Sequence, residues 1–249
     1  MKIVDSHTHV DISEVFGWYD PPESIIELME KAGISKAVIM SYVDAPALNA
    51  DILNYIAACV RKYPDKLVGY ARIHPGYGAE ALTILCEAIG SLGFKGLKLH
   101  PESIVTHPYN QTAMALIRKA GELNAPTLFH SGDECLSLPL QIGKCAEACR
   151  DSIIIMGHMG GFFHMEEAIR TAEKYDNIYL DTSAMPYPEL VRKAVDRIGA
   201  DRVLFGSDGP GCNPALEVKK IKLAGLSEKQ FSKVMGENIL GILEKVRIP

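Results

Sequence analysis

Residues 4–10 read VDSHTHV, a short apolar, β-branched run that carries His7 and His9 two positions apart. Side chains two apart on a β-strand point to the same side of the strand, so both imidazoles can face one ion. Taken alone, such a pair could equally be a chance coincidence or two histidines that hydrogen-bond within a core. The rest of the chain distinguishes these interpretations.

Similar apolar runs recur along the chain, and each is followed by a longer segment with helical spacing and charged outer positions. Most runs are continuously apolar, which is typical of parallel strands covered on both faces. The predicted strands are Lys2–His7, Lys36–Met40, Leu67–Ile73, Gly96–His100, Pro126–His130, Ile153–Gly157, Ile178–Asp181 and Val203–Gly206. The predicted helices are Pro22–Ala32, Asn49–Tyr63, Ala79–Ser91, Gln111–Leu123, Pro139–Arg150, Met165–Tyr175, Glu189–Ile198 and Ala215–Leu223.

This alternation over 249 residues predicts an α/β fold, a single-domain (β/α)8 TIM barrel spanning residues 1–249, with parallel strands inside and helices outside. A doubly wound open sheet is the alternative, but the chain has no GxGxxG or Walker-type loop. No stretch is rich in Pro, Gly and Ser together, so no linker between domains is indicated.

Composition narrows the class of partner. The net charge is −5 and the basic residues are dispersed, so no surface for nucleic acid or anionic membrane is indicated. The segment after Met1 has too few apolar residues for a secretory signal, and no later run approaches the ~20 residues that span a bilayer. We expect a cytoplasmic protein that acts on a small molecule; a homodimer is left open.

Polar residues gather where the predicted strands end, and in a barrel those ends form the active-site face. His100, His130, His158 and Asp208 lie there, together with the HxH pair. His130 and Asp208 can complete the coordination of one ion bound by His7 and His9. Mixed nitrogen and oxygen ligation suits one divalent ion, zinc first, with manganese or iron as alternatives.

With these motifs in order, the chain resembles the amidohydrolase superfamily, in particular its amidohydrolase-related ("amidohydrolase 2") branch of hydrolases, lactonases and non-oxidative decarboxylases. The resemblance covers nearly the whole chain. It rests on DSHTHV, KGLKLHP, FHSG, GHMGG, YLDTSA, LFGSDGP and GENILGILE.

The resemblance implies a role for each matching residue. His7, His9, His130 and Asp208 would be the metal ligands, and Asp208 would also be catalytic as general base. His158 would lie beside the metal, as a second catalytic residue that polarises the substrate or moves protons.

From these roles we expect a metal-dependent hydrolase of a small amide, lactone or ester, in which the ion activates a water as nucleophile. A metal-dependent non-oxidative decarboxylase of an aromatic or unsaturated acid is the main alternative, because its ligand set would be so similar. A non-catalytic binding protein on the same barrel is the third possibility.

Three further residues are candidates for substrate binding: Arg72, Lys98 and His100. Arg72 could clamp a carboxylate or form a buried ion pair. Lys98 could be carboxylated and bridge two ions, as in some relatives, but we prefer one metal and an interior lysine paired with a carboxylate. The loop at residues 11–22 is expected to contribute to substrate choice.

Overall fold

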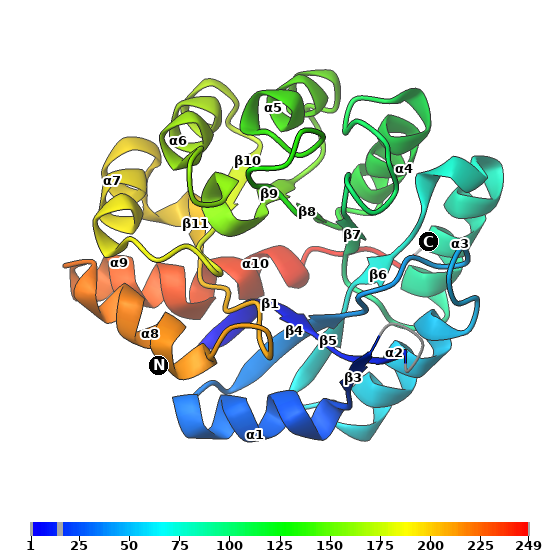
Figure 1. The fold of residues 1–249 in the computed structure, drawn as a ribbon, viewed down its shortest axis with the longest axis horizontal. Helices are drawn as coiled ribbons and strands as arrows, with labels where there is room; N and C mark the ends of the chain where they lie inside the picture. Colours follow the sequence, from blue (N-terminus) through cyan, green and yellow to red (C-terminus); the bar gives the residue numbers. More distant parts are fainter. Residues whose placement is uncertain (1, 14–16, 249) are drawn as a thin grey trace.

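Short parallel strands form a closed ring in the computed structural model, which describes residues 2–13 and 17–248 (Figure 1). They are β1 (Val4–His9), β4 (Lys36–Met40), β5 (Leu67–Gly69), β6 (Ala71–Arg72), β7 (Leu97–Leu99), β8 (Thr127–Phe129), β9 (Ile154–Met156), β10 (Ile178–Asp181) and β11 (Val203–Leu204). The order is β1-β4-β5 in one sheet and β11-β10-β9-β8-β7-β6 in the other. β5 and β6 follow one another on either side of Tyr70, so they occupy one position in the ring.

Backbone hydrogen bonds between the first strand and the segment after the last strand close the ring. Ser6 N donates to Phe205 O at 2.9 Å, and His9 N donates to Gly209 O at 2.7 Å. In the other direction, Asp208 N donates to His7 O at 2.7 Å. The closure confirms the predicted (β/α)8 barrel over the doubly wound sheet.

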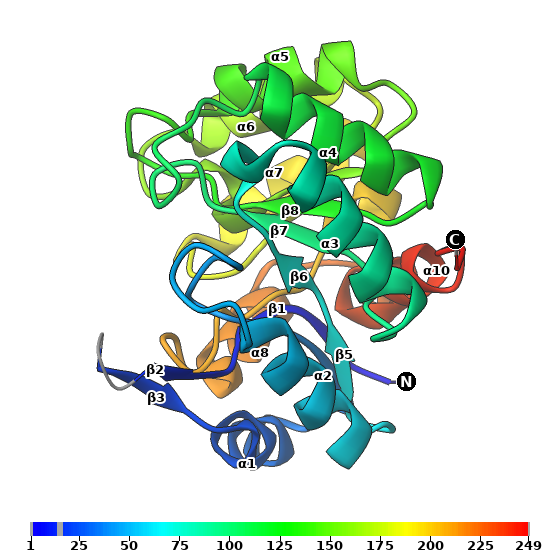
Figure 2. The same cartoon turned by 90° about the vertical axis from the view of Figure 1, so that its right-hand side faces the viewer.

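Helices cover the outside of the barrel, close to the predicted positions (Figures 1 and 2). They are α1 (Pro22–Ala32), α2 (Ile52–Lys62), α3 (Ala79–Gly90), α4 (Gln111–Glu122), α5 (Pro139–Ala148), α6 (Met165–Lys174), α7 (Pro188–Ile198) and α8 (Pro214–Leu223). The ends follow local chemistry: Pro22 begins α1, and Gly33 ends it with a positive φ of 72°. Asn110 and Asn213 cap α4 and α8 through their side-chain oxygens.

A C-terminal helical segment that was not predicted closes the end of the barrel where the strands begin. It comprises α9 (Glu228–Ser232), the π-helical turn η5 (Lys233–Glu237) and α10 (Asn238–Leu243). Ile239 and Ile242 of α10 join the barrel's interior core with Val4, Tyr70 and Leu204. With this end filled by apolar side chains, the opposite end of the barrel is left for the site.

The structure corrects the prediction in two further places. β1 runs on to His9, where His7 was predicted as the last strand residue, and its pairing with β4 shifts by one residue between Asp5 and Thr8. The predicted loop at residues 11–22 contains an antiparallel hairpin, β2 (Asp11–Ser13) and β3 (Trp18–Asp20), which lies beside α1 at the edge of the barrel (Figure 2). Residues 1, 14–16 and 249 of the predicted domain and loop lie outside the described residues.

The helices of residues 2–13 and 17–248 are all too short or too polar to cross a membrane.

Candidate metal centre and substrate cavity

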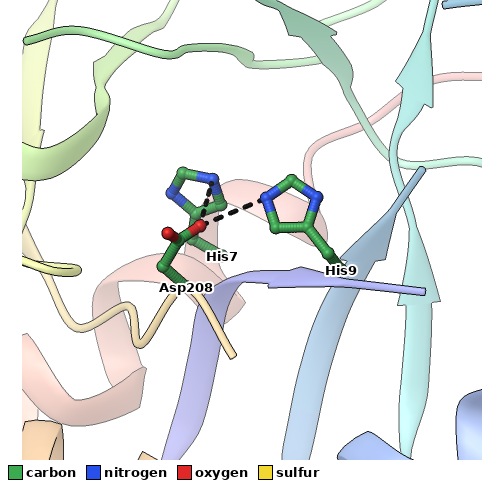
Figure 3. A group of neighbouring side chains, drawn as sticks. All are labelled: His7, His9 and Asp208. Atoms are coloured by element: carbon green, nitrogen blue, oxygen red, sulfur yellow. Dashed lines mark ion pairs between the residues drawn. The ribbon is translucent and has the colours of Figure 1, made fainter. Parts of the chain in front are cut away.

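His7, His9 and Asp208 come together at the closing edge of the barrel (Figure 3). Asp208 Oδ1 lies 3.5 Å from His7 Nε2 and 3.2 Å from His9 Nε2. Both imidazoles are buried, so water competes little for these nitrogens. Two adjacent imidazoles and one carboxylate, from a strand and the loop opposite it, form a donor set of the kind that binds a divalent ion.

Hydrogen bonds beneath the cluster hold its loop in place. Asp5 Oδ1 accepts from the backbone N–H of His7 at 3.2 Å and from that of Ser207 at 2.9 Å. Asp208 itself has a positive φ of 62°, which is uncommon for a residue with a side chain. The strained backbone and the buried anchor together direct the Asp208 carboxylate towards the two histidines.

The Nδ1 atom of His7, on the side of the ring away from Asp208, faces hydrogen-bond acceptors. His7 Nδ1 lies 3.4 Å from Asp181 Oδ2 and 3.1 Å from Ser183 Oγ. Because an ionised carboxylate only accepts, Nδ1 carries the proton and Nε2 keeps its lone pair. That lone pair faces Asp208 and Lys98, whose Nζ lies 2.8 Å from His7 Nε2. Lys98 is interior, as predicted, but its hydrogen-bond partner is this histidine and not a carboxylate.

His158 follows β9 in the short turn η3 (Gly157–Gly160), where its own φ is 57°. Glycine is required before it, because a Cβ at Gly157 would lie 2.5 Å from Phe129 O. The turn directs His158 Nε2 to within 3.1 Å of His130 Nδ1 and His158 Nδ1 to within 3.0 Å of Ser183 Oγ. His158 therefore connects the end of β8 with the end of β10.

His130 is held on three sides. Its ring stacks on His100, its Nδ1 faces His158, and its Nε2 lies 3.2 and 3.3 Å from the two carboxylate oxygens of Glu134. Of the four predicted ligands, His130 alone lies outside the close group formed by His7, His9 and Asp208. Its role as a ligand remains a prediction.

Arg72 is buried in an ion pair on the other side of the site. Its Nε lies 3.0 Å from Asp44 Oδ1, and its Nη2 lies 3.3 Å from Asp44 Oδ2 and 2.8 Å from Ser103 Oγ. Arg72, Lys98 and His100 line one cavity of about 260 Å³, which also reaches His9 and Asp208. The three predicted substrate-binding residues thus share this cavity with three predicted ligands, His9, His130 and Asp208.

A second cavity of about 150 Å³ lies beside the first. His158, Glu134 and Phe162 line it, and His130 and Asp208 border both cavities. The two spaces therefore meet at the residues predicted to do chemistry.

Burial sets the charge of the site. Desolvation lowers the pKa of His9 to about 4 and that of His158 to about 3, so both rings are neutral at pH 7. Burial alone would raise the pKa of Asp208, but the hydrogen bond with His9 and the nearby histidines hold it well below its usual range. Neutral imidazoles and an ionised carboxylate are the ligand forms that bind metals, so the residues fit a divalent ion.

Sequence reasoning missed several residues that position the others. Ser183 bridges His7 and His158, Glu134 holds His130, and Asp44 pairs with Arg72. A usable signal existed for Asp44, which follows β4 at the active-site end. The contacts of Ser183 and Glu134 depend on how the loops fold across one another.

Comparison with known proteins gives the chain a family and a fold. The Amidohydro_2 family, described as amidohydrolase, matches residues 4–243. A comparison with curated proteins finds no match.

Similar solved structures include 5-carboxyvanillate decarboxylase LigW from Sphingomonas paucimobilis, with 13% identity, a TM-score of 0.79 and coverage of 98% of this chain and 99% of the other. The LigW2 D314N mutant from Novosphingobium aromaticivorans, with bound manganese, has 14% identity, a TM-score of 0.83 and coverage of 98% and 97%. A dihydroxybenzoic acid decarboxylase from Polaromonas sp. JS666, with bound manganese and 2-nitroresorcinol, has 17% identity, a TM-score of 0.77 and coverage of 98% and 97%. At these levels of sequence identity, the structural similarity establishes the barrel fold alone.

Proposed function

Because this chain belongs to the Amidohydro_2 family of amidohydrolases, we propose that it is a metal-dependent enzyme that decarboxylates a small hydroxylated aromatic or unsaturated acid. The observation that carries the proposal is the cavity of about 260 Å³, in which His9 and Asp208 share one wall with the basic side chains of Arg72 and Lys98. The solved decarboxylases of the same fold support decarboxylation over the hydrolysis that the sequence led us to expect first.

The cavity suits a flat, anionic molecule. Tyr42 stacks on His9, with ring centroids 4.5 Å apart, and Trp18 and Leu48 add apolar surface. Arg72 can offset the charge of a carboxylate, although Asp44 already neutralises part of Arg72. Burial lowers the pKa of Lys98 to about 7, so Lys98 contributes positive charge only where it is protonated. Pockets for drug-sized ligands run to roughly 300–1,000 Å³, so this one selects a small acid.

The residues of the site can carry out the proton transfers. When bound, a divalent ion would polarise oxygen atoms of the acid and favour loss of the carboxylate. Asp208, ionised at neutral pH, accepts the proton of a substrate hydroxyl. As the carbon–carbon bond breaks, its electron pair stays on the substrate carbon and carbon dioxide leaves. Asp208 then returns the proton to that carbon, with His158 beside it to orient the substrate.

The proposed cofactor is one divalent ion per chain, held by His7, His9, Asp208 and His130. Zinc was the first expectation from the ligand types. The bound manganese in two of the solved structures of this fold makes manganese the metal to test beside it.

Hydrolysis of a small amide, lactone or ester is the second candidate. It is favoured by the position of Asp208, whose carboxylate oxygen lies 3.5 Å from His7 Nε2 and 3.2 Å from His9 Nε2, where it could accept a proton from a water held at the metal site.

The test begins with elemental analysis of protein purified without chelator, beside His130→Ala and a matched control, His164→Ala. His164 lies outside the site and pairs with Glu167 at 3.3 Å. We expect about one ion per wild-type and His164→Ala chain, and much less in His130→Ala. A stoichiometric metal in neither wild type nor control would contradict both candidate functions.

The second step separates the two reactions. Zinc- and manganese-loaded protein is incubated with hydroxylated aromatic acids, lactones and amides, and both released carbon dioxide and products are measured. Carbon dioxide formed together with the decarboxylated product supports the proposal. Hydrolysis without carbon dioxide moves the conclusion to the second candidate.

A further inference from the structure

Resting on the proposed function, we propose that Glu134 is a positioning residue that fixes the tautomers of His130 and His158 through a hydrogen-bond chain that continues to His7. Nothing in the HxH pattern or the ligand set calls for Glu134. Its effect would be to choose which nitrogen of each histidine keeps a lone pair for the metal or the substrate.

The hydrogen-bond chain starts at Glu134, in the loop that follows β8. Both carboxylate oxygens of Glu134 lie within 3.3 Å of His130 Nε2, and Ser137 Oγ donates to Glu134 Oε2 at 3.2 Å. Glu134 is half-exposed, while its partner His130 is mostly enclosed. The loop therefore brings an ionised group from the surface to one specific ring nitrogen.

The direction of the hydrogen bonds follows from which groups can donate and which can only accept. An ionised glutamate only accepts, so His130 Nε2 must carry the proton, and a neutral His130 keeps its lone pair on Nδ1. That lone pair faces His158 Nε2 at 3.1 Å, so His158 donates there and keeps its own lone pair on Nδ1.

The same logic continues to the metal cluster. Ser183 Oγ–H donates to His158 Nδ1 at 3.0 Å, and Ser183 Oγ in turn accepts from His7 Nδ1–H at 3.1 Å. His7 Nε2 is left with a lone pair directed at Asp208. A single acceptor at the surface thus accounts for the hydrogen bonds from Glu134 through His130, His158 and Ser183 to His7.

Without Glu134 the opposite direction becomes available. His158 Nδ1 lies 3.3 Å from the carbonyl oxygen of Ser183 and could donate to it. His158 Nε2 would then accept from His130 Nδ1, which would take the lone pair of His130 away from the site. The two arrangements differ in tautomer and not in heavy-atom positions.

The test reads the tautomers by ¹⁵N NMR of histidine side chains in metal-free protein. The variants are Glu134→Gln and Glu134→Ala, since glutamine can also donate and alanine does neither. The control is Asp133→Asn, which removes the same charge from the same loop; Asp133 accepts from the backbone N–H groups of Phe162 and Phe163 and does not touch His130.

We expect wild type and Asp133→Asn to hold His130 as the Nε2–H tautomer, and both Glu134 variants to show a mixture. Affinity for zinc or manganese, measured by competition with a chelator, should fall about 10- to 100-fold in the Glu134 variants only. His130 protonated on Nδ1 in wild type, or an unchanged tautomer in Glu134→Ala, would overturn the inference.

These outcomes are separate from those of the proposed function. Decarboxylation with unchanged tautomers in the variants defeats only the role of Glu134. Altered tautomers with no decarboxylation by wild type defeat only the assignment of the reaction.

Discussion

The imidazole of His100 lies flat against that of His130, with ring centroids 3.9 Å apart and planes 5° from parallel. This stack fixes the plane of His130 from the side of the substrate cavity, while Glu134 and His158 hold its edges. One face of His100 therefore packs against His130, and His100 also lines the cavity in which we propose that the substrate binds. Substitutions of His100 can separate its packing against His130 from its proposed contact with the substrate.

We expect His100→Phe to keep the stack and the metal, because a flat ring remains against His130. KM for the acid should rise, since the imidazole nitrogens are lost. His100→Ala should lose metal affinity as well, because His130 is no longer held in plane. Metal titration and steady-state kinetics on both variants check this; equal metal loss in both would show that the stack does not position His130.

Arg72→Met is expected to destabilise the fold by about 3–5 kcal/mol, because the buried carboxylate of Asp44 is left without its partner. The double variant Arg72→Met/Asp44→Asn should recover much of this loss. Urea unfolding measures both, with Arg192→Met as control, since that arginine pairs with Asp196 on the surface and should change stability little. Equal losses in the single and double variants would rule out an unpaired charge as the cause.

Gly96→Ala should destabilise the barrel by about 1–3 kcal/mol through overpacking. A Cβ at Gly96 would lie 2.6 Å from the ring of Tyr70, which is fully buried among the interior side chains. Gly241→Ala is the matched control, because nothing lies within 4 Å of its Cβ. In α10 it should stabilise by about 0.4–1 kcal/mol. Chemical unfolding of the two variants is the measurement, and a loss at Gly241 as large as that at Gly96 would contradict the packing explanation.

Glu23 should make stability depend on pH in the acid range. The hydrogen bonds from Lys62 and then Tyr63 lower its pKa from 4.5 to about 2. A lowered pKa means that the stabilisation is present above 4.5 and is lost as the pH falls through 2. The melting temperature of Glu23→Gln should thus be slightly below that of wild type at pH 7, and the gap should narrow below pH 4.5. A gap that stays constant down to pH 3 would contradict this linkage.

The alternation of strands and helices could be predicted because buried parallel strands need continuous apolar runs, whereas the helices need only one apolar face. The hairpin of β2 and β3 could not, since strands of three residues are too short for a pattern to show. For the C-terminal helices the sequence contains one usable signal, the capping box of Ser227 and Gln230, which marks the start of α9.

The site was predictable to the extent that one strand or strand end placed its residues. His7 and His9 converge because they share β1, and Asp208 joins them because the barrel closes there. Glu134 and Ser183 act across loops, and sequence spacing says nothing about which loop reaches which ring.

Two of the backbone bonds that close the barrel involve residues whose side chains form the cluster: Asp208 N donates to His7 O, and His9 N donates to Gly209 O. The site where the barrel closes is therefore also the site where the proposed metal ligands meet, and it is made from segments some 200 residues apart in the sequence. During synthesis, His7 and His9 leave the ribosome early but lack the Asp208 carboxylate until most of the chain has followed. Capture of a divalent ion by the proposed ligands would thus be a late event, open only to a chain whose barrel has closed.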